Sequence, residues 1–280
     1  MGSAKVAFVL GGGGVLGAVQ VGMLRSLLER AVRPDLIVGT SIGAINGAII
    51  AAGVDLSVAR LERAWTSREA RALTNGAGIR PGRTHVMSTG PLLRLLKTGL
   101  PTARTFADLE VEFRCCAASI ERAAEHWFSE GALIPAVLAS AALPGVFPAV
   151  EIDGEHFLDG GIVNSIPISE AAAAGATEIH VLQVGRIEFP LAAPRHQLDN
   201  ARVAFEIARR HRFARDSASL PAGVRLHVLP TGVATERENR IARNVTPDAV
   251  RRRIDGAYHA TCAYLEHEGL AKPAPHGIRS

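Results

Sequence analysis

The fold is decided by Leu36-Ile37-Val38-Gly39-Thr40-Ser41-Ile42-Gly43, an apolar run that leads into a serine flanked by glycines. Small residues follow from position 44 to 52, so the stretch predicts a strand, a tight turn and a helix. Glycine two positions either side of the serine suits a turn in which strand and helix approach too closely for a Cβ atom. Such a turn lifts the Ser41 hydroxyl above the sheet, at a helix N-terminus that favours negative charge. Ser41 is therefore a candidate nucleophile, and an ordinary capping serine is the alternative.

A second glycine turn stands nearer the start of the chain. Ala4 to Leu10 predicts a buried strand, and apolar residues recur at helical spacing from Val15 to about Arg30. Between them, Gly12-Gly13-Gly14-Val15-Leu16-Gly17 fits the pattern G-x-G-x-x-G. Two such strand–helix units in succession predict parallel strands with right-handed crossovers. Both turns then lie at the carboxyl edge of the sheet, where ligands bind in open α/β folds.

The first glycine run has two chemical interpretations. Consecutive glycine N–H groups form an anion-binding nest, which beside a nucleophilic serine would serve as an oxyanion hole. The same glycines fit a dinucleotide fingerprint, so a Rossmann-type NAD(P)-binding oxidoreductase is the main alternative. That class needs an acidic residue at the end of the second strand, whereas Asp35 stands at its beginning and Gly39-Thr40-Ser41 at its end. The dinucleotide interpretation is therefore disfavoured, and a P-loop is excluded because its lysine is absent.

The rest of the chain continues the alternation of strands and helices. Asp153-Gly154 between two short apolar runs predicts a hairpin. The Gly- and Pro-rich segment 72–104 is interpreted as a flap or access loop beside the site. We expect one domain over residues 4–268 and a loose tail over 269–280. Strands are predicted at 113–120, 125–128, 150–152, 156–158, 178–184 and 224–229, and helices at 56–70, 92–97, 134–142, 167–174, 201–216 and 246–268.

Composition points to a globular chain with a substantial core. The 280 residues are 48% hydrophobic and 21% charged. Three cysteines, two of them adjacent at positions 115 and 116, do not make a disulfide framework, and without a secretory signal a cytoplasmic location is expected. The uncharged run from Leu36 to Val54 is long enough to raise the question of a membrane span. Its glycines and polar side chains favour a buried strand, turn and helix instead.

A serine nucleophile needs a base. Several histidines follow Asp159, as in the α/β-hydrolases, but only one strand precedes Ser41, and those folds place several there. Asp159-Gly160-Gly161 ends a strand-like segment, and its glycines permit a close approach of the backbone. An aspartate could take the serine proton directly if desolvation raised its pKa from the usual value of about 3.9. A simple Asp-Gly-Gly turn is the alternative.

Taken in order, the two glycine turns and Asp159-Gly160-Gly161 resemble the patatin-like phospholipases. Residues 139–148, ending Leu143-Pro144-Gly145-Val146-Phe147-Pro148, and the stretch from Asn164 to Pro167 are similar to the same family. The resemblance covers roughly residues 4–185. It implies a three-layer α/β/α fold with a central, mostly parallel sheet, and the activity of a serine lipid acyl hydrolase of the phospholipase or lysophospholipase type.

The resemblance also implies roles for individual residues. Ser41 would be the nucleophile and Asp159 the general base of a Ser-Asp dyad, with no metal and no cofactor. The substrate would be a lipid or another acyl ester, and no nucleic acid partner is expected. The N–H groups of Gly12, Gly13, Gly14 and Ile42 would form the oxyanion hole, and Gly17, Gly39, Gly43, Gly160 and Gly161 are the remaining motif glycines.

Two features qualify this interpretation. The family usually carries Arg or Lys where this chain has Leu16, which puts phosphate recognition in doubt and leaves a neutral ester or lysolipid open; the pair Asn164-Ser165 also departs from the family's pattern. Residues 200–260 hold 12 arginines against 6 acidic residues. This basic C-terminal region, including the helix at 201–216, would suit peripheral contact with an anionic membrane, the alternative being a solvated helix face. A catalytically silent lipid-binding module is the third hypothesis.

Overall fold

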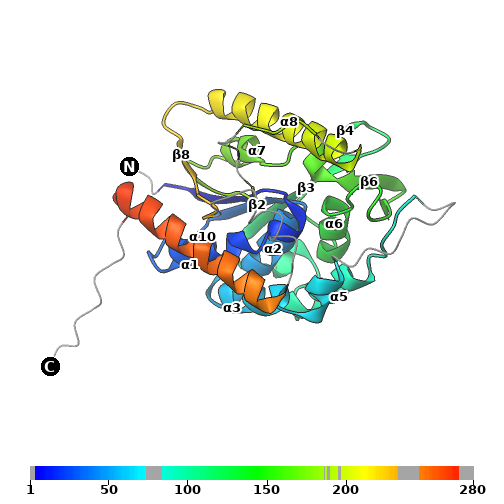
Figure 1. Cartoon of the computed structure of the whole chain (residues 1–280), viewed down its shortest axis with the longest axis horizontal. Helices are drawn as coiled ribbons and strands as arrows, with labels where there is room; N and C mark the ends of the chain where they lie inside the picture. The colour runs from blue at the N-terminus through cyan, green and yellow to red at the C-terminus, as the bar shows by residue number, and fades with distance from the viewer. Residues whose placement is uncertain are drawn as a thin grey trace.

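A twisted sheet runs through the centre of the molecule and carries helices on both faces (Figure 1). The computed structural model describes residues 4–73, 84–185, 187, 190–194, 197–232 and 246–270. Within these residues the sheet has eight strands, in the order β5-β6-β3-β2-β1-β7-β8, with β4 paired to β3. The predicted α/β/α arrangement around a mostly parallel sheet is confirmed.

The parallel strands occupy the middle of the sheet. β1 (Val6–Leu10) lies between β2 (Leu36–Thr40) and β7 (Glu178–Leu182), while β3 (Glu112–Ser119) pairs with β2 and β8 (Arg225–Val228) with β7. Strands covered on both faces need apolar side chains in both directions. This is why β1 and β2 read as nearly continuous apolar runs.

Three antiparallel strands extend the sheet beyond β3. β4 (Ala124–Phe128) and β6 (Glu155–Asp159) both pair with β3, and β5 (Val150–Ile152) pairs with β6. Asp153 and Gly154, which connect β5 to β6, have φ angles of 53° and 80°. Two successive positive φ angles match the twist of a two-residue hairpin, so the Asp-Gly prediction is confirmed.

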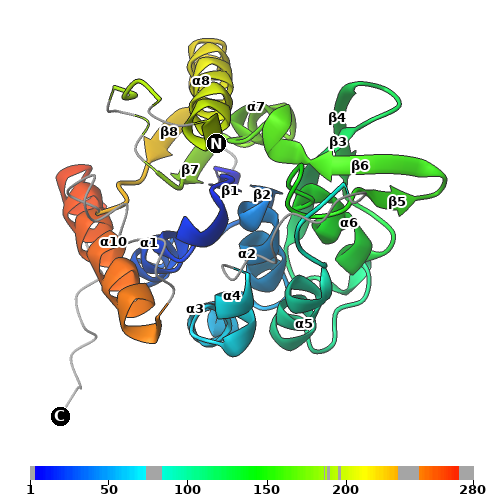
Figure 2. The ribbon, with the colours of Figure 1, turned by 45° about the vertical axis from the view of Figure 1, so that its right-hand side comes forward.

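The alternation of side chains along β1 divides the core into two layers. Phe8 and Leu10 pack against the larger helical layer, and Ala7 and Val9 pack against the other. Figure 2 shows the two helical layers on opposite sides of the sheet. The larger layer holds α1 (Val19–Leu28), α2 (Ile42–Ala51), α3 (Val54–Trp65), α5 (Gly90–Gly99), α6 (Leu133–Ser140) and α10 (Pro247–His267); the other holds α7 (Ile168–Ala173) and α8 (Gln197–Ala218).

Element boundaries differ from expectation in a few places. The helix predicted over 56–70 is two helices, because Ser67 accepts a hydrogen bond from the Ala70 N–H and begins α4 (Arg68–Ala72) afresh. The basic helix α8 starts at Gln197 rather than 201, and α5 extends the predicted 92–97 at both ends. Residues 74–83 of the predicted flap 72–104, and residues 271–280 of the predicted tail 269–280, lie outside the described residues.

The long uncharged run from Leu36 to Val54 forms β2, α2 and the first residue of α3, as predicted. Among the helices that the structure describes, none combines the length and the hydropathy that a membrane crossing requires.

Candidate active site

Two strands meet head-on along one edge of β3. β2 runs parallel to β3 and places Thr40 opposite Cys116, while β6 runs antiparallel and places Asp159 opposite Ala117. β4 pairs with residues 115–119 of β3 and therefore occupies the other edge. The carboxyl ends of β2 and β6 thus face consecutive residues of one strand. This is how residues far apart in the sequence reach the same point.

Ser41 and Asp159 are in direct contact there. The Ser41 hydroxyl donates to Asp159 Oδ2 at 2.5 Å, across 118 positions of sequence. Asp159 Oδ1 accepts the N–H of Gly161 at 2.7 Å, and the Ser41 N–H donates to Ser140 Oγ at 3.0 Å. Each residue is therefore held by a second contact, Ser41 through its backbone and Asp159 through its side chain, and the carboxylate is oriented toward the hydroxyl.

The backbone at Ser41 is strained. Its φ of 59° and ψ of −124° are unusual for a residue with a side chain and carry a cost of about 1–3 kcal/mol. The flanking glycines make the turn feasible. A Cβ atom at Gly39 would lie 2.6 Å from the Gly43 carbonyl oxygen, and one at Gly43 would lie 2.0 Å from the Leu10 carbonyl oxygen. The close packing that these glycines permit holds Ser41 at the apex of the turn in spite of the strain.

Burial tunes the Asp159 carboxyl. The side chain lies in the interior and is 1% exposed. Burial raises its pKa to about 6, although the hydrogen bonds from Ser41 and Gly161 act in the opposite direction. A carboxylate with a pKa in this range is ionised at neutral pH and still accepts a proton readily, which suits a general base.

The glycine loop lies beside the serine. A Cβ atom at Gly12 would touch Ser41 Cβ at 3.3 Å. The Gly12 N–H already donates to the Ser165 carbonyl at 2.9 Å, so it is not available to an oxyanion. Within the described residues, the N–H groups of Gly13, Gly14 and Ile42 have no protein acceptor. Gly13 and Gly14 are exposed at the surface of the loop.

The segment after Asp159 ties the two glycine turns together. A Cβ atom at Gly160 would lie 2.1 Å from the Cys116 carbonyl oxygen, so the chain turns directly against β3. Thr40 Oγ1 donates to the Asn164 carbonyl at 2.8 Å, and the next carbonyl, that of Ser165, receives the Gly12 N–H. The family-like stretch from Asn164 therefore holds the two glycine turns through its backbone carbonyls.

Sequence reasoning missed several residues of this site. Ser140 is the one polar side chain in α6, which is the signal that could have indicated its role. Gln20, Asn46 and Trp65 form a buried polar network behind the glycine loop. In the described part of the chain no histidine hydrogen-bonds to Ser41 or Asp159.

The histidines that follow Asp159 in β7 and β8 lie elsewhere. His180 and His227 stack on each other with ring centroids 4.8 Å apart, and His180 Nε2 pairs with Glu178 at 3.0 Å. Burial and the neighbouring His227 lower the pKa of His180 to about 4, which keeps this side chain neutral at physiological pH. These histidines are core residues.

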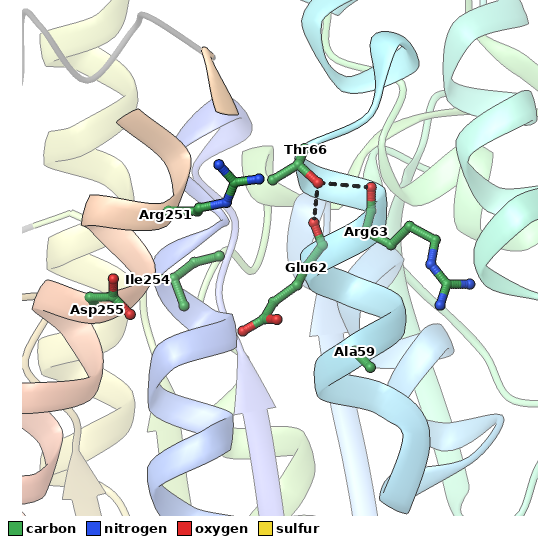
Figure 3. A pocket seen from close by; sticks show the side chains of 7 residues that line it. All are labelled: Ala59, Glu62, Arg63, Thr66, Arg251, Ile254 and Asp255. Atoms are coloured by element: carbon green, nitrogen blue, oxygen red, sulfur yellow. Dashed lines mark hydrogen bonds between the residues drawn. The ribbon is translucent and has the colours of Figure 1, made fainter. Parts of the chain in front are cut away.

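A groove of about 390 Å³ lies between α3 and α10, apart from the serine (Figure 3). Its walls carry both charge signs, and neither Ser41 nor Asp159 is among the residues that line it: Ala59, Glu62, Arg63, Thr66, Arg251, Ile254 and Asp255.

The fold and this site define an α/β protein in which a serine hydroxyl donates a hydrogen bond to a buried carboxylate at the carboxyl edge of the sheet. The family model of the patatin-like phospholipases matches residues 8–172. The chain belongs to the patatin-like phospholipase family, as the sequence motifs indicate, and membership supports a lipid-hydrolysing enzyme.

Similar proteins include larger members of this family. The chain is 32% identical over 191 residues to mouse patatin-like phospholipase domain-containing protein 7, covering 64% of this chain and 14% of that protein. It is 30% identical over 198 residues to lysophospholipase nte1 of Aspergillus terreus, covering 66% of this chain and 12% of that protein. An uncharacterised NTE family protein of Mycobacterium bovis is 31% identical over 180 residues, covering 62% of this chain and 47% of that protein. The matched region is thus a small part of the first two relatives.

Among solved structures, VipD from Legionella pneumophila has a similar fold. The TM-score is 0.54 at 15% sequence identity, over 95% of this chain and 67% of that chain. At this identity the likeness concerns the fold alone.

Proposed function

We propose that the protein is a serine lipid acyl hydrolase in which Ser41 is the nucleophile and Asp159 the general base. One observation carries the proposal: a strained serine at a strand–helix turn donates a 2.5 Å hydrogen bond to a buried carboxylate. Membership of the patatin-like phospholipases and the likeness to a protein named lysophospholipase support a lipid ester as the substrate.

The first half of the reaction forms an acyl-enzyme. Ser41 Oγ attacks the carbonyl carbon of the ester while its proton passes to Asp159 Oδ2. The tetrahedral intermediate then collapses, the bond to the leaving alcohol breaks, and Asp159 returns the proton to the departing oxygen. The free alcohol or lysolipid leaves, and the acyl chain stays on Ser41.

The second half releases the acid. Asp159 takes a proton from a water molecule as the water oxygen attacks the acyl carbon. Collapse of the second intermediate breaks the bond to Ser41 Oγ, which regains its proton from Asp159. The product is a carboxylic acid, and the dyad is restored.

The negative oxygen of each intermediate needs donors. Gly12 is engaged with Ser165, so the proposal assigns the oxyanion hole to the N–H groups of Gly13, Gly14 and Ile42. Ile42 is the first residue of α2, whose dipole adds to its donor strength. A single such donor is worth about 10²–10³ in kcat.

Substrate preference follows from Leu16. This residue lies in the short helix η1 (Gly14–Leu16), partly buried against the larger core cluster. An aliphatic side chain offers no charge to a phosphate, so we propose a neutral acyl ester or a lysolipid as the preferred substrate. Contact of the basic C-terminal region with an anionic membrane remains part of the proposal. Co-sedimentation with liposomes, with and without anionic lipid, tests it.

The central experiment measures hydrolysis of a short p-nitrophenyl ester by the wild type and by Ser41→Ala and Asp159→Asn. Both substitutions should abolish hydrolysis while circular dichroism shows a folded protein. Full activity in Asp159→Asn would rule out the dyad. A lipid-ester panel read by mass spectrometry then identifies the preferred substrate.

A fluorophosphonate probe separates an enzyme from a lipid-binding module. Labelling of the wild type, lost in Ser41→Ala, would support the enzyme, and absence of labelling would support a silent module. Saturable NAD(P) binding by calorimetry would instead favour an oxidoreductase.

A further inference from the structure

Two buried side-chain amides hold the ends of the glycine loop. Gln20 on α1 and Asn46 on α2 are each 1% exposed. Gln20 Nε2 donates to the carbonyl oxygens of Gly11, at 2.9 Å, and Leu182, at 2.7 Å. Asn46 Nδ2 donates to the carbonyl oxygen of Gly17 at 3.1 Å. The residues at which the loop begins and ends are therefore each fixed by an amide.

The two amides also bond to each other and to a tryptophan. Asn46 Nδ2 donates to Gln20 Oε1 at 2.7 Å, and Trp65 Nε1 donates to Asn46 Oδ1 at 3.2 Å. Both N–H groups of each amide and both amide oxygens are thereby used, which leaves neither side chain an alternative orientation. We call Gln20, Asn46 and Trp65 the amide clamp.

The amide clamp connects the loop to the helix of the nucleophile. Asn46 lies five positions after Ser41, on the helix that the serine begins. The contact is reinforced by packing, because a Cβ atom at Gly17 would lie 2.5 Å from the Ile42 side chain and 2.8 Å from Trp65. The loop that carries Gly13 and Gly14 is thus tied to α2 rather than free to move against it.

A core made only for stability would not need this network. Buried amides must be fully hydrogen-bonded to avoid a desolvation cost, and apolar side chains fill the same space without that demand. α2 is otherwise built from apolar residues and glycines. A polar side chain that reaches from it to both a neighbouring amide and the loop backbone fixes a distance that apolar packing would leave adjustable.

We propose that the amide clamp is a positioning device: it sets the Gly13 and Gly14 N–H groups at the height above Ser41 that the oxyanion requires. The inference rests on the proposed function. The three members of the amide clamp hydrogen-bond to backbone carbonyls and to one another rather than to Ser41 or Asp159. The rate depends steeply on the placement of such groups, because a displacement of about 1 Å can lower it about 10²-fold.

The test uses Trp65→Phe, which removes the indole N–H together with the part of the ring system that lies near Gly17, and Asn46→Ala, which removes the centre of the clamp. Active sites are titrated to completion with a fluorophosphonate, and kcat per titrated site is measured on a p-nitrophenyl ester. We expect kcat to fall about 10-fold in Trp65→Phe and about 100-fold in Asn46→Ala, with KM within twofold of wild type. Affinity for a trifluoromethyl ketone, which forms a tetrahedral adduct with the serine, should fall in parallel.

The matched control is Ser57→Ala. Ser57 lies on α3, the helix of Trp65, is fully buried, and donates one hydrogen bond to the Val54 carbonyl at 2.6 Å rather than to the glycine loop. It should lower the melting temperature without changing kcat per site. In the Asn46→Ala background, Trp65→Phe should add no further loss of kcat, because its acceptor is gone.

Unchanged kcat per titrated site in both clamp variants would overturn the inference, even if their melting temperatures fell. So would a loss of ketone affinity in Ser57→Ala equal to that in Trp65→Phe. Failure of the proposed function looks different: the wild type itself would be inactive, or Ser41→Ala would retain activity.

Discussion

Ser41 and Asp159 share a hydrogen bond whose acceptor is buried and whose donor stands on a strained backbone. Burial outweighs the two hydrogen bonds to the carboxylate and raises the pKa of Asp159 to about 6. Ionisation of this carboxyl should therefore raise the rate of the proposed reaction and lower the stability of the fold.

The pH dependence of the rate should reflect this pKa. The proposed base must be ionised, so kcat/KM should rise with pH through about 6 and level off above it. An ester with an unactivated alcohol should be included, to exclude intrinsic hydrolysis at high pH. A plateau that extends down to pH 4 would show that Asp159 is not the titrating base.

The Asp159→Asn substitution should stabilise the protein while inactivating it. A folded-state pKa of about 6 against an ordinary value of 3.8 in the unfolded chain means that stability is full below pH 3.8 and is lost as pH rises through 6. The ionised carboxylate then costs about 3 kcal/mol at pH 7.5. Asparagine can accept the Gly161 N–H and donate to Ser41 without a charge.

Urea unfolding at two pH values checks this. The free energy of unfolding of Asp159→Asn should exceed that of the wild type by up to about 3 kcal/mol at pH 7.5. This difference should shrink toward zero near pH 3.5. A difference that does not depend on pH would mean that packing, rather than charge, separates the two proteins.

Gly43→Ala should disrupt the turn that carries the serine. The added Cβ would lie 2.0 Å from the Leu10 carbonyl oxygen, so β1 and α2 would have to separate. We expect a loss of about 1–3 kcal/mol in unfolding free energy and loss of ester hydrolysis.

Gly256→Ala is the control for crowding. Gly256 lies inside α10, where the nearest atom of the described residues outside that helix's own backbone would be 3.7 Å from an added Cβ. Alanine there should stabilise the protein by about 0.5–1 kcal/mol and leave kcat unchanged. Equal effects of the two alanines on kcat would contradict the proposed role of the turn.

Leu16→Arg should shift substrate preference. An arginine at the edge of the glycine loop would give a phosphate group a bidentate partner. The ratio of kcat/KM for a phospholipid over that for a neutral ester should rise about 10-fold, whereas Leu16→Gln, which is polar and uncharged, should leave it within twofold. No change with arginine would show that position 16 does not face the head group.

Local patterns predicted most of the fold. Immediate neighbours are enough to predict a strand–helix turn from the glycines at 39 and 43. The same holds for the hairpin predicted from Asp153-Gly154. Strand and helix periodicities likewise depend on nearby residues. The break between α3 and α4 was missed because Ser67 reads as part of a polar helix face unless its cap contact is known.

The contacts among distant residues were harder to predict. Asn46 interrupts an apolar run, but only the fold shows that its partners are Gln20, Gly17 and Trp65. The hydrogen bond from the Gly12 N–H to the Ser165 carbonyl likewise joins residues 165 − 12 = 153 positions apart. No local sequence pattern indicates that the N–H of Gly12 is engaged while those of Gly13 and Gly14 are not.

The head-on meeting of β2 and β6 makes the chemistry depend on a short ladder. The register of β6 against β3 comprises three residue pairs, from Ala117–Asp159 to Ser119–Phe157. A slip of one position would turn the carboxylate to the opposite side of the sheet, and a slip of two would move it about 6.8 Å along β3. A molecule with that error would keep nearly all its core and still be inactive. The register of the hairpin β5–β6 therefore decides whether a folded chain is catalytically competent.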